Sequence, residues 1–171
     1  MIRLRDLCKK DAVYMLEWMH DADIQACFQK SMASMTLQDA ERFCENSAKT
    51  NKKDLMSGDS LHYAIVDEND EYLGTISLKN LNFDAKNAEY AISVRKKAQG
   101  TGAAKEATEL LIKKSVEEFG FHKIYLNVLS DNIRAIRFYE KCGFKYEGEA
   151  RDHVVKNGRY MSLKWYCIIS D

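Results

Sequence analysis

The stretch that decides the fold reads Val94-Arg95-Lys96-Lys97-Ala98-Gln99-Gly100-Thr101-Gly102-Ala103-Ala104. A strand-like run, 88–94, leads into it and a helix-like run, 103–119, follows, so two glycines lie where a strand turns into a helix. The first turn of a helix leaves backbone N–H groups unpaired and carries a partial positive charge. Because Gly100 and Gly102 lack a Cβ, the loop can lie close against a phosphate. The stretch therefore predicts an anion site.

The spacing of this loop disfavours two widespread phosphate-binding motifs. A P-loop carries Lys-Ser or Lys-Thr directly after its last glycine, whereas Ala103 and Ala104 follow Gly102. A dinucleotide fingerprint has glycine or alanine where Lys105 stands, and it normally opens a parallel-sheet domain instead of following a long N-terminal part. The hypothesis that the protein is an oxidoreductase with a nucleotide cofactor would thus rest on the glycines alone.

Length and composition indicate one globular domain, 1–171, with no specialised surface. Lys plus Arg and Asp plus Glu both number 26, so no basic excess favours nucleic acid. No apolar run approaches the roughly 18 residues of a membrane span, and the first residues lack a signal-peptide core. We expect a cytoplasmic protein that binds neither nucleic acid nor membrane.

The cysteines and histidines show no metal-binding pattern. The five cysteines include no C-x-x-C pair, and the four histidines include no i,i+4 pair. We therefore expect free buried thiols and no structural metal.

Apolar periodicity, caps and glycines predict the order of the elements. The expected strands are 2–5, 62–66, 72–78, 88–94, 123–129, 144–155 and 160–168, and the expected helices are 10–20, 37–48, 103–119 and 133–141. The polar stretch 46–60 is expected to be an exposed loop. A strand–helix–strand unit of the length of 88–129 favours a parallel, right-handed crossover. Asn157-Gly158 marks the turn of a final hairpin.

Two motifs and this order resemble one family. Gln99-x-x-Gly102-x-Ala104 is similar to the pyrophosphate loop of the GNAT superfamily of acyl-CoA-dependent N-acetyltransferases. Residues 132–144 resemble its Asn-x-x-Ala-x-x-x-Tyr-x-x-x-Gly-Phe segment, at the family's separation from the loop. Residues 147–151 and 157–160 further resemble the RimJ/RimL-like branch, which acetylates protein amino termini, amino sugars and polyamines.

The resemblance implies a fold and a reaction. The fold is α+β (mixed α/β), with a central, mostly antiparallel sheet of about seven strands flanked by about four helices. The reaction is transfer of an acetyl group from acetyl-CoA (CoA) to a primary amine by direct attack. The amine is a protein or peptide N-terminus or a small molecule, with a nucleotide-linked amino sugar or a polyamine as alternatives, and fold alone does not choose among them. A homodimer formed through strand edges is a further expectation.

The resemblance also assigns residues to the cofactor. The backbone of Ile92, Ser93 and Val94 pairs with the pantetheine arm, as an added strand would. The N–H groups of Gln99, Gly100, Thr101, Gly102, Ala103 and Ala104 hold the pyrophosphate. Candidates for the outer phosphates are Arg95, Arg134, Arg137 and Lys141, although surface charge alone would explain each. Asn132 and Tyr139 share one helix face and reach opposite ends of the thioester arm; an N-cap and a core tyrosine are their alternative roles.

The chemistry needs an acid and a base. The resemblance assigns protonation of the departing thiolate to the Tyr139 phenol. Most primary amines are protonated at neutral pH, so a base or a water chain must remove a proton. Some relatives carry glutamate where Asn127 stands, and an amide cannot act as a base, so Glu89 is the best remaining carboxylate, with a solvent-exposed strand-edge glutamate as the alternative. Ser162 also departs from the aspartate of many RimJ/RimL-like proteins.

The sequence leaves two other functional hypotheses open. A covalent transfer through Cys142 is less favoured than a packed thiol at a helix end. A module that holds acyl-CoA without catalysis is kept open by the amide at Asn127 and opposed by the presence of Tyr139. The acceptor site is expected to be lined by 20–35, 46–60 and the final hairpin.

Overall fold

The computed structural model describes residues 1–170, which form one seven-stranded sheet in the order β1-β2-β3-β4-β5-β7-β6. The strands are β1 (Arg3–Asp6), β2 (Leu61–Val66), β3 (Tyr72–Asn82), β4 (Asn87–Val94), β5 (Lys123–Leu129), β6 (Lys145–Lys156) and β7 (Arg159–Ile169). All neighbouring strands are antiparallel except β4 and β5, which are parallel. The predicted mixed, mostly antiparallel sheet of seven strands and the parallel connection from β4 to β5 are confirmed.

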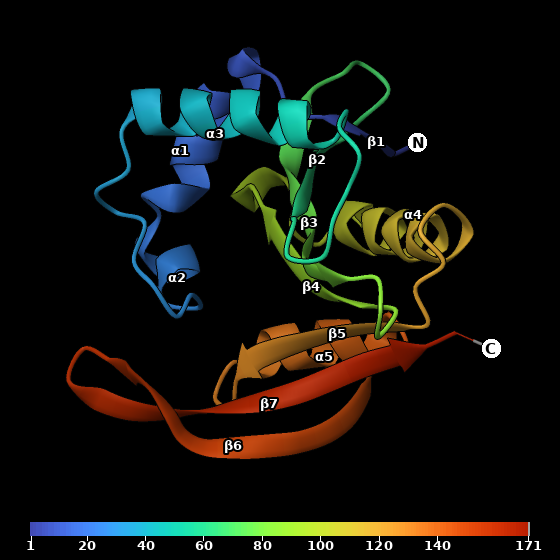
Figure 1. The fold of residues 1–171 in the computed structure, drawn as a ribbon. Coiled ribbons are helices and arrows are strands. Elements are labelled where there is room, and N and C mark those ends of the chain that lie inside the picture. The colour runs from blue at the N-terminus through green and yellow to red at the C-terminus, as the bar shows by residue number, and fades with distance from the viewer. Residues whose placement is uncertain (171) are drawn as a thin grey trace.

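Helices cover both faces of this sheet (Figure 1). They are α1 (Ala12–Met19), α2 (Ala22–Gln25), α3 (Leu37–Thr50), α4 (Ala103–Glu117) and α5 (Ile133–Lys141), with short 3-10 turns at Lys9–Asp11 and Lys96–Ala98. α1 and α3 pack with Ala64 and Val66 in one apolar cluster. α4 and α5 pack with Tyr63, Ile65 and the alternate residues of the neighbouring strands in a larger cluster. The period-two alternation of the strands thus separates two cores.

Local capping chemistry explains where the helices begin. Thr36 and Asp39 form a capping box at the start of α3, in which each side chain accepts from the other residue's backbone N–H. Asp21 caps α2, a helix of four residues that the sequence analysis did not predict, so the structure has five α-helices instead of about four. The expected loop 46–60 starts later than predicted, because α3 runs on to Thr50.

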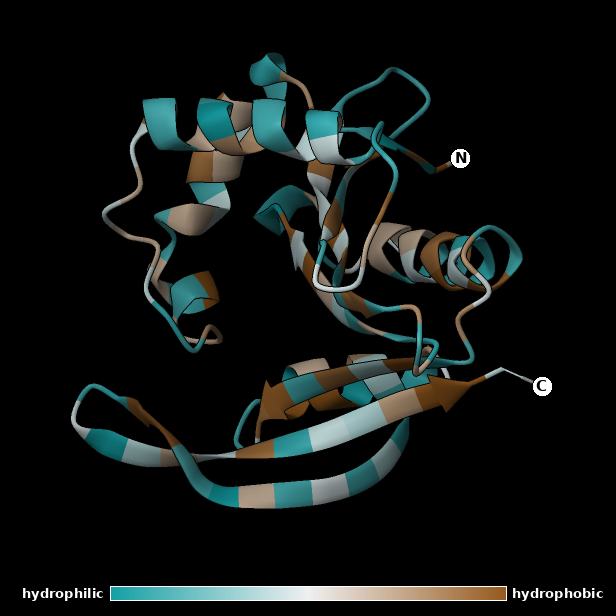
Figure 2. Ribbon diagram, viewed as in Figure 1, coloured by the Kyte–Doolittle hydropathy of each residue, from teal (hydrophilic) through white to brown (hydrophobic). Residues whose placement is uncertain are grey.

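The C-terminal hairpin is the exposed edge of the sheet. Apolar and polar residues alternate along β5, whereas β6 is polar and solvent-facing along most of its length (Figure 2). Asn157 and Gly158 both have positive φ and form the predicted turn between β6 and β7. No helix within residues 1–170 is long and apolar enough to cross a membrane.

The parallel pair β4 and β5 separates part-way along its length. The two strands pair only at Asn87, Ala88 and Glu89 of β4, opposite Lys123 to Tyr125 of β5, although both strands continue further. Beyond Glu89, β4 pairs with β3 alone. One backbone edge of 90–94 is therefore without a neighbouring strand. This separation positions the site described next.

Candidate active site

The glycine loop presents unpaired backbone donors. Gly100 and Gly102 have φ of 78° and 88°, the left-handed region that favours glycine. The Thr101 hydroxyl donates to the Ala98 carbonyl at 2.7 Å and so ties the loop together. Within this loop, the N–H groups of Gly100, Thr101, Gly102, Ala104 and Lys105 donate to no acceptor in residues 1–170. Such convergent donors at a helix start fit a pyrophosphate.

Two predicted donors of the loop are already engaged. The Gln99 N–H donates to the Lys96 carbonyl at 3.1 Å, and the Ala103 N–H donates to the Thr101 hydroxyl at 3.3 Å. Ile92, Ser93 and Val94 lie where β4 has no partner on its β5 side. An extended ligand arm can therefore pair with their backbone as an added strand.

The start of α5 reaches the same loop. Asn132 is the N-cap of α5, because its side-chain oxygen accepts from the Ala135 N–H at 3.2 Å. Its side-chain amide donates to no residue within 1–170. Arg134 donates to the Gln99 side-chain oxygen at 2.6 Å, so the two sequence motifs meet in space. The N-cap alternative for Asn132 is realised, with a donor left over for a ligand.

Arg95 does not belong with the phosphate candidates. Its guanidinium is buried, pairs with Glu17 at 2.7 Å and Glu71 at 3.1 Å, and lies over the Tyr14 ring. The prediction that Arg95 contacts the outer phosphates is therefore wrong: its charge joins α1 to the ends of β3 and β4. The other three candidates, Arg134, Arg137 and Lys141, are solvent-exposed.

Tyr139 has an unpartnered hydroxyl. The half-buried ring lies 6.0 Å from both Tyr90 and Phe144, measured between ring centroids. Its hydroxyl forms no hydrogen bond with residues 1–170 and is not sealed from solvent. Burial, with smaller effects from the thiols of Cys27 and Cys142, raises the pKa of Tyr139 to about 12. The phenol therefore holds its proton at neutral pH and is free to donate it.

Glu89 lies on the face of the sheet opposite to Tyr139, and its carboxylate is held by three neighbouring side chains. It accepts from Asn80 at 2.8 Å and Asn127 at 3.4 Å, and it pairs with Lys79 at 3.0 Å. Its side chain is 15% exposed, so the solvent-exposed alternative is wrong. The amide at Asn127, which weakened the case for catalysis at the sequence level, is thus a partner of the candidate base.

An aromatic pair lies beside this carboxylate. Tyr125 is the register partner of Glu89, and Trp165 is the register partner of Asn127, so all four share one sheet face. The Tyr125 and Trp165 rings lie 6.0 Å apart, and both side chains are partly exposed. Sequence reasoning missed this pair, although the alternation of β5 already places Tyr125 on the same face as Asn127.

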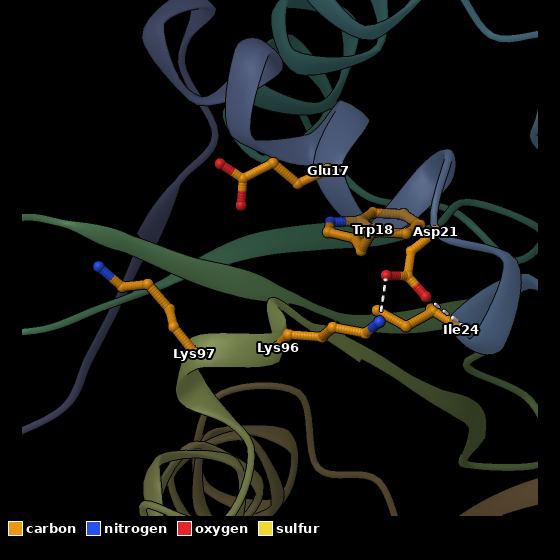
Figure 3. Close-up of a pocket in the computed structure, with 6 residues that line it drawn as sticks. All are labelled: Glu17, Trp18, Asp21, Ile24, Lys96 and Lys97. Atoms are coloured by element: carbon orange, nitrogen blue, oxygen red, sulfur yellow. Dashed lines mark hydrogen bonds and ion pairs between the residues drawn. The ribbon is translucent and has the colours of Figure 1, made fainter.

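Segment 21–32 extends across this face. Asp21 pairs with Lys96 at 2.7 Å beside a cavity of about 280 Å³ between α1 and the 3-10 turn Lys96–Ala98, shown in Figure 3. Gln29 donates to the Asn127 side-chain oxygen at 2.5 Å. The segment thus spans from the strand end that precedes the glycine loop to β5, as expected for part of the acceptor lining.

The thiols are free but differ in exposure. Cys44 and Cys167 are buried as predicted, whereas Cys27 is exposed. Burial raises the pKa of the Cys142 thiol, which lowers its thiolate fraction at neutral pH. Cys142 is therefore poorly suited to carry an acetyl group.

Comparison with known proteins supplies the family. Residues 2–145 match the acetyltransferase (GNAT) domain family. The spermidine N(1)-acetyltransferase of Escherichia coli K12 is 28% identical over 98% of this chain and 85% of its own length. That of Vibrio cholerae is 31% identical over 60% of this chain and 59% of its own length. A crystal structure of spermidine N-acetyltransferase from V. cholerae, in complex with CoA and spermine, has a TM-score of 0.84 at 24% identity and covers 98% of this chain and 95% of that one.

These matches agree with the fold and with the two motifs that lie at the separation of β4 and β5. GNAT acetyltransferases use acetyl-CoA as the acyl donor, which is the cofactor predicted from the sequence. The chain belongs to the GNAT acetyltransferase family and is an acetyltransferase of that type.

Proposed function

We propose that this protein transfers the acetyl group of acetyl-CoA to a primary amine of a polyamine. The observation that supports the proposal is the separation of β4 from β5, with the Tyr139 ring packed against Tyr90 of β4 on one face of the sheet and the Glu89 carboxylate on the other. Acetyl-CoA supplies the activated acyl group. The loop at Gly100–Lys105 and the free edge of β4 bind and orient it, while Tyr139 holds the proton that the leaving sulfur takes.

The acceptor class follows from the face around Glu89. A polyamine carries several ammonium groups, and a carboxylate beside partly exposed aromatic rings is a suitable environment for one of them. Glu89, Tyr125 and Trp165 form such an environment. The named activity of the E. coli and V. cholerae relatives supports the same class. In this proposal Glu89 accepts the amine proton, directly or through water.

A peptide amino terminus is the second candidate. A putative ribosomal N-acetyltransferase of Bacillus subtilis is 30% identical over 56% of this chain, and its name supports an acceptor in the ribosome instead of a polyamine. The RimJ/RimL-like resemblance of the C-terminal hairpin points the same way, but the named polyamine acetyltransferases among the relatives do not support that branch.

A screen of acceptors distinguishes these candidates. Thiol release from acetyl-CoA is followed with spermidine, spermine, a peptide with a free amino terminus and an amino sugar, each at equal concentration. The proposal predicts the highest kcat/KM for a polyamine. Higher kcat/KM for the peptide or the sugar would replace the substrate class, and acetyl-CoA binding without turnover of any amine would indicate a binding module.

The assembly and location of the protein are part of the proposal. We propose one acetyltransferase domain, 1–171, that forms a cytoplasmic homo-oligomer. The spermidine N-acetyltransferase from V. cholerae has been described as dodecameric, which supports assembly beyond the predicted homodimer. Sedimentation of the full chain gives the oligomeric state directly.

A further inference from the structure

Segment 21–32 is held from outside by one lysine of the C-terminal hairpin. The Lys156 ammonium donates to the carbonyls of Gln25 at 2.9 Å, Ala26 at 2.5 Å and Phe28. These carbonyls lie about 130 residues away along the chain and include the C-terminal end of α2. All three donors of the ammonium are thus used on one short turn, at the negative end of a helix.

The same turn is fixed from inside by other contacts. The buried Gln25 side chain donates to the Trp18 carbonyl at 3.2 Å and accepts from the Met32 N–H at 2.7 Å. The Phe28 ring stacks on Trp18 with centroids 5.9 Å apart. The Gln25 carbonyl also accepts from the Phe28 N–H at 3.1 Å. The carbonyls of Ala26 and Phe28 have Lys156 as their donor within residues 1–170.

Gln29, the residue directly after this turn, belongs to the proposed acceptor site. Gln29 follows Phe28 and donates to Asn127, and Asn127 donates to Glu89. Cys27, within the turn, lies close enough to Tyr139 to influence its pKa. A shift of the turn would therefore move Gln29, whose partner Asn127 donates to the candidate base.

We propose that Lys156 is a positioning residue for the acceptor amine. Its three bonds to carbonyls fix the turn 25–28, and the turn fixes Gln29 against Asn127 on the acceptor side of the opening between β4 and β5. Lys156 touches neither the cofactor loop nor the reacting atoms, so its role is to shape acceptor binding. The kinetic part of this inference rests on the proposed amine acetylation, whereas its structural part does not.

The test compares Lys156→Met with Lys145→Met in the full chain. Lys145 lies on the same strand and is exposed, and its side chain makes no hydrogen bond or ion pair within residues 1–170, so its replacement changes the net charge equally. Hydrogen–deuterium exchange of peptides covering 21–32 is expected to accelerate about tenfold in Lys156→Met and to stay unchanged in Lys145→Met. Lys156→Arg, which keeps the charge and the donors, is expected to restore most of the protection.

The kinetic expectation separates positioning from general damage. In Lys156→Met the KM for the amine rises about tenfold, while the KM for acetyl-CoA changes by less than about twofold. An acetyl-CoA thermal shift equal to the wild type shows that the variant is folded. Unchanged exchange in 21–32, or an equal rise of the amine KM in Lys145→Met, would overturn the proposal. Wild-type protein that turns over no amine would refute the proposed function alone, because the exchange result still decides the role of Lys156.

Discussion

Tyr139 is the residue on which the proposed chemistry depends most. We expect Tyr139→Phe to lower kcat by about 100-fold or more, because a positioned general acid contributes roughly 10²–10⁴-fold. The ring packing against Tyr90 and Phe144 is kept, so the acetyl-CoA thermal shift should match the wild type. Because the pKa of Tyr139 is raised to about 12, the wild-type phenol stays protonated throughout a neutral-pH assay. Wild-type kcat in the phenylalanine variant would show that the phenol is not the acid.

Glu89 is the second residue with a sharp expectation. Glu89→Gln keeps the size of the side chain and removes the negative charge next to Lys79. We expect kcat/KM for the amine to fall about 100-fold, since both proton acceptance and attraction of an ammonium are lost. Steady-state kinetics at fixed acetyl-CoA measure this.

The control for that experiment is Lys79→Met, which removes the ion-pair partner and keeps the carboxylate with its two amide donors. Its kcat/KM should stay within about threefold of the wild type, because a partly exposed ion pair contributes little. Equal losses in the two variants would mean that the pair is structural and that Glu89 has no chemical role.

At the scale of elements, β3 packs closely against β4 and so holds the free edge of β4, which is proposed to bind the pantetheine arm of the cofactor. A Cβ at Gly74 would lie 2.4 Å from the Ser93 carbonyl oxygen and 2.9 Å from Val94 Cα. We expect Gly74→Ala to cost about 1–3 kcal/mol of unfolding free energy, the usual range for overpacking. It should also weaken acetyl-CoA binding, because Ser93 and Val94 belong to the free edge of β4.

Gly148→Ala is the matched control for this substitution. Gly148 lies in β6, and a Cβ there would meet no atom within 4 Å. Urea unfolding and an acetyl-CoA titration of both variants compare the effects. Equal stability and affinity in Gly74→Ala and Gly148→Ala would contradict the account of the β4 edge.

The elements themselves were largely predictable from local pattern. Helix α4 begins at Ala103, as predicted, because the glycine before it and one apolar face specify it. Helix α2 was missed because four residues carry no periodicity, although the capping aspartate, Asp21, was visible. The extent of α3 was underestimated because its last turn, ending at Thr50, is polar.

The site was predictable only where one local motif specifies it. The glycine loop and the α5 motif could be placed from spacing, and the contact of Arg134 with Gln99 brings them together. The bonds of Gln29 to Asn127 and of Lys156 to segment 21–32 join residues about 100 to 130 positions apart, so no local pattern announces them. The predicted role of Arg95 was wrong for the same reason, because its partner Glu17 lies on a helix far away in the sequence.

At the scale of the whole molecule, His62 links stability to pH. It packs against Phe43 and hydrogen-bonds Ser77 at 2.7 Å, and burial lowers its pKa to about 4 from an ordinary 6.5. The folded-state pKa is depressed, so the unfolded state binds more protons below about pH 6.5. The contribution of neutral His62 to the free energy of unfolding is therefore fully present above pH 6.5 and is lost as the pH falls towards 4.

We expect the wild type to lose about 2–3 kcal/mol more unfolding free energy than His62→Gln between pH 7.5 and 4.5. Urea unfolding of both proteins at the two pH values measures the difference. Glutamine keeps a polar side chain next to Ser77 and cannot become charged. Parallel losses in the two proteins would mean that His62 is already protonated in the folded state.

The central proposal is that the protein acetylates a polyamine. The separated strands β4 and β5, the glycine loop and the face around Glu89 all support it. The measurement that tests it most directly is the mass of the product after incubation of the wild-type protein with acetyl-CoA and spermidine, together with the thiol released. The account predicts acetylated spermidine and one equivalent of free thiol for each acetyl group transferred. Unmodified spermidine, with acetyl-CoA bound and no thiol released, would contradict it.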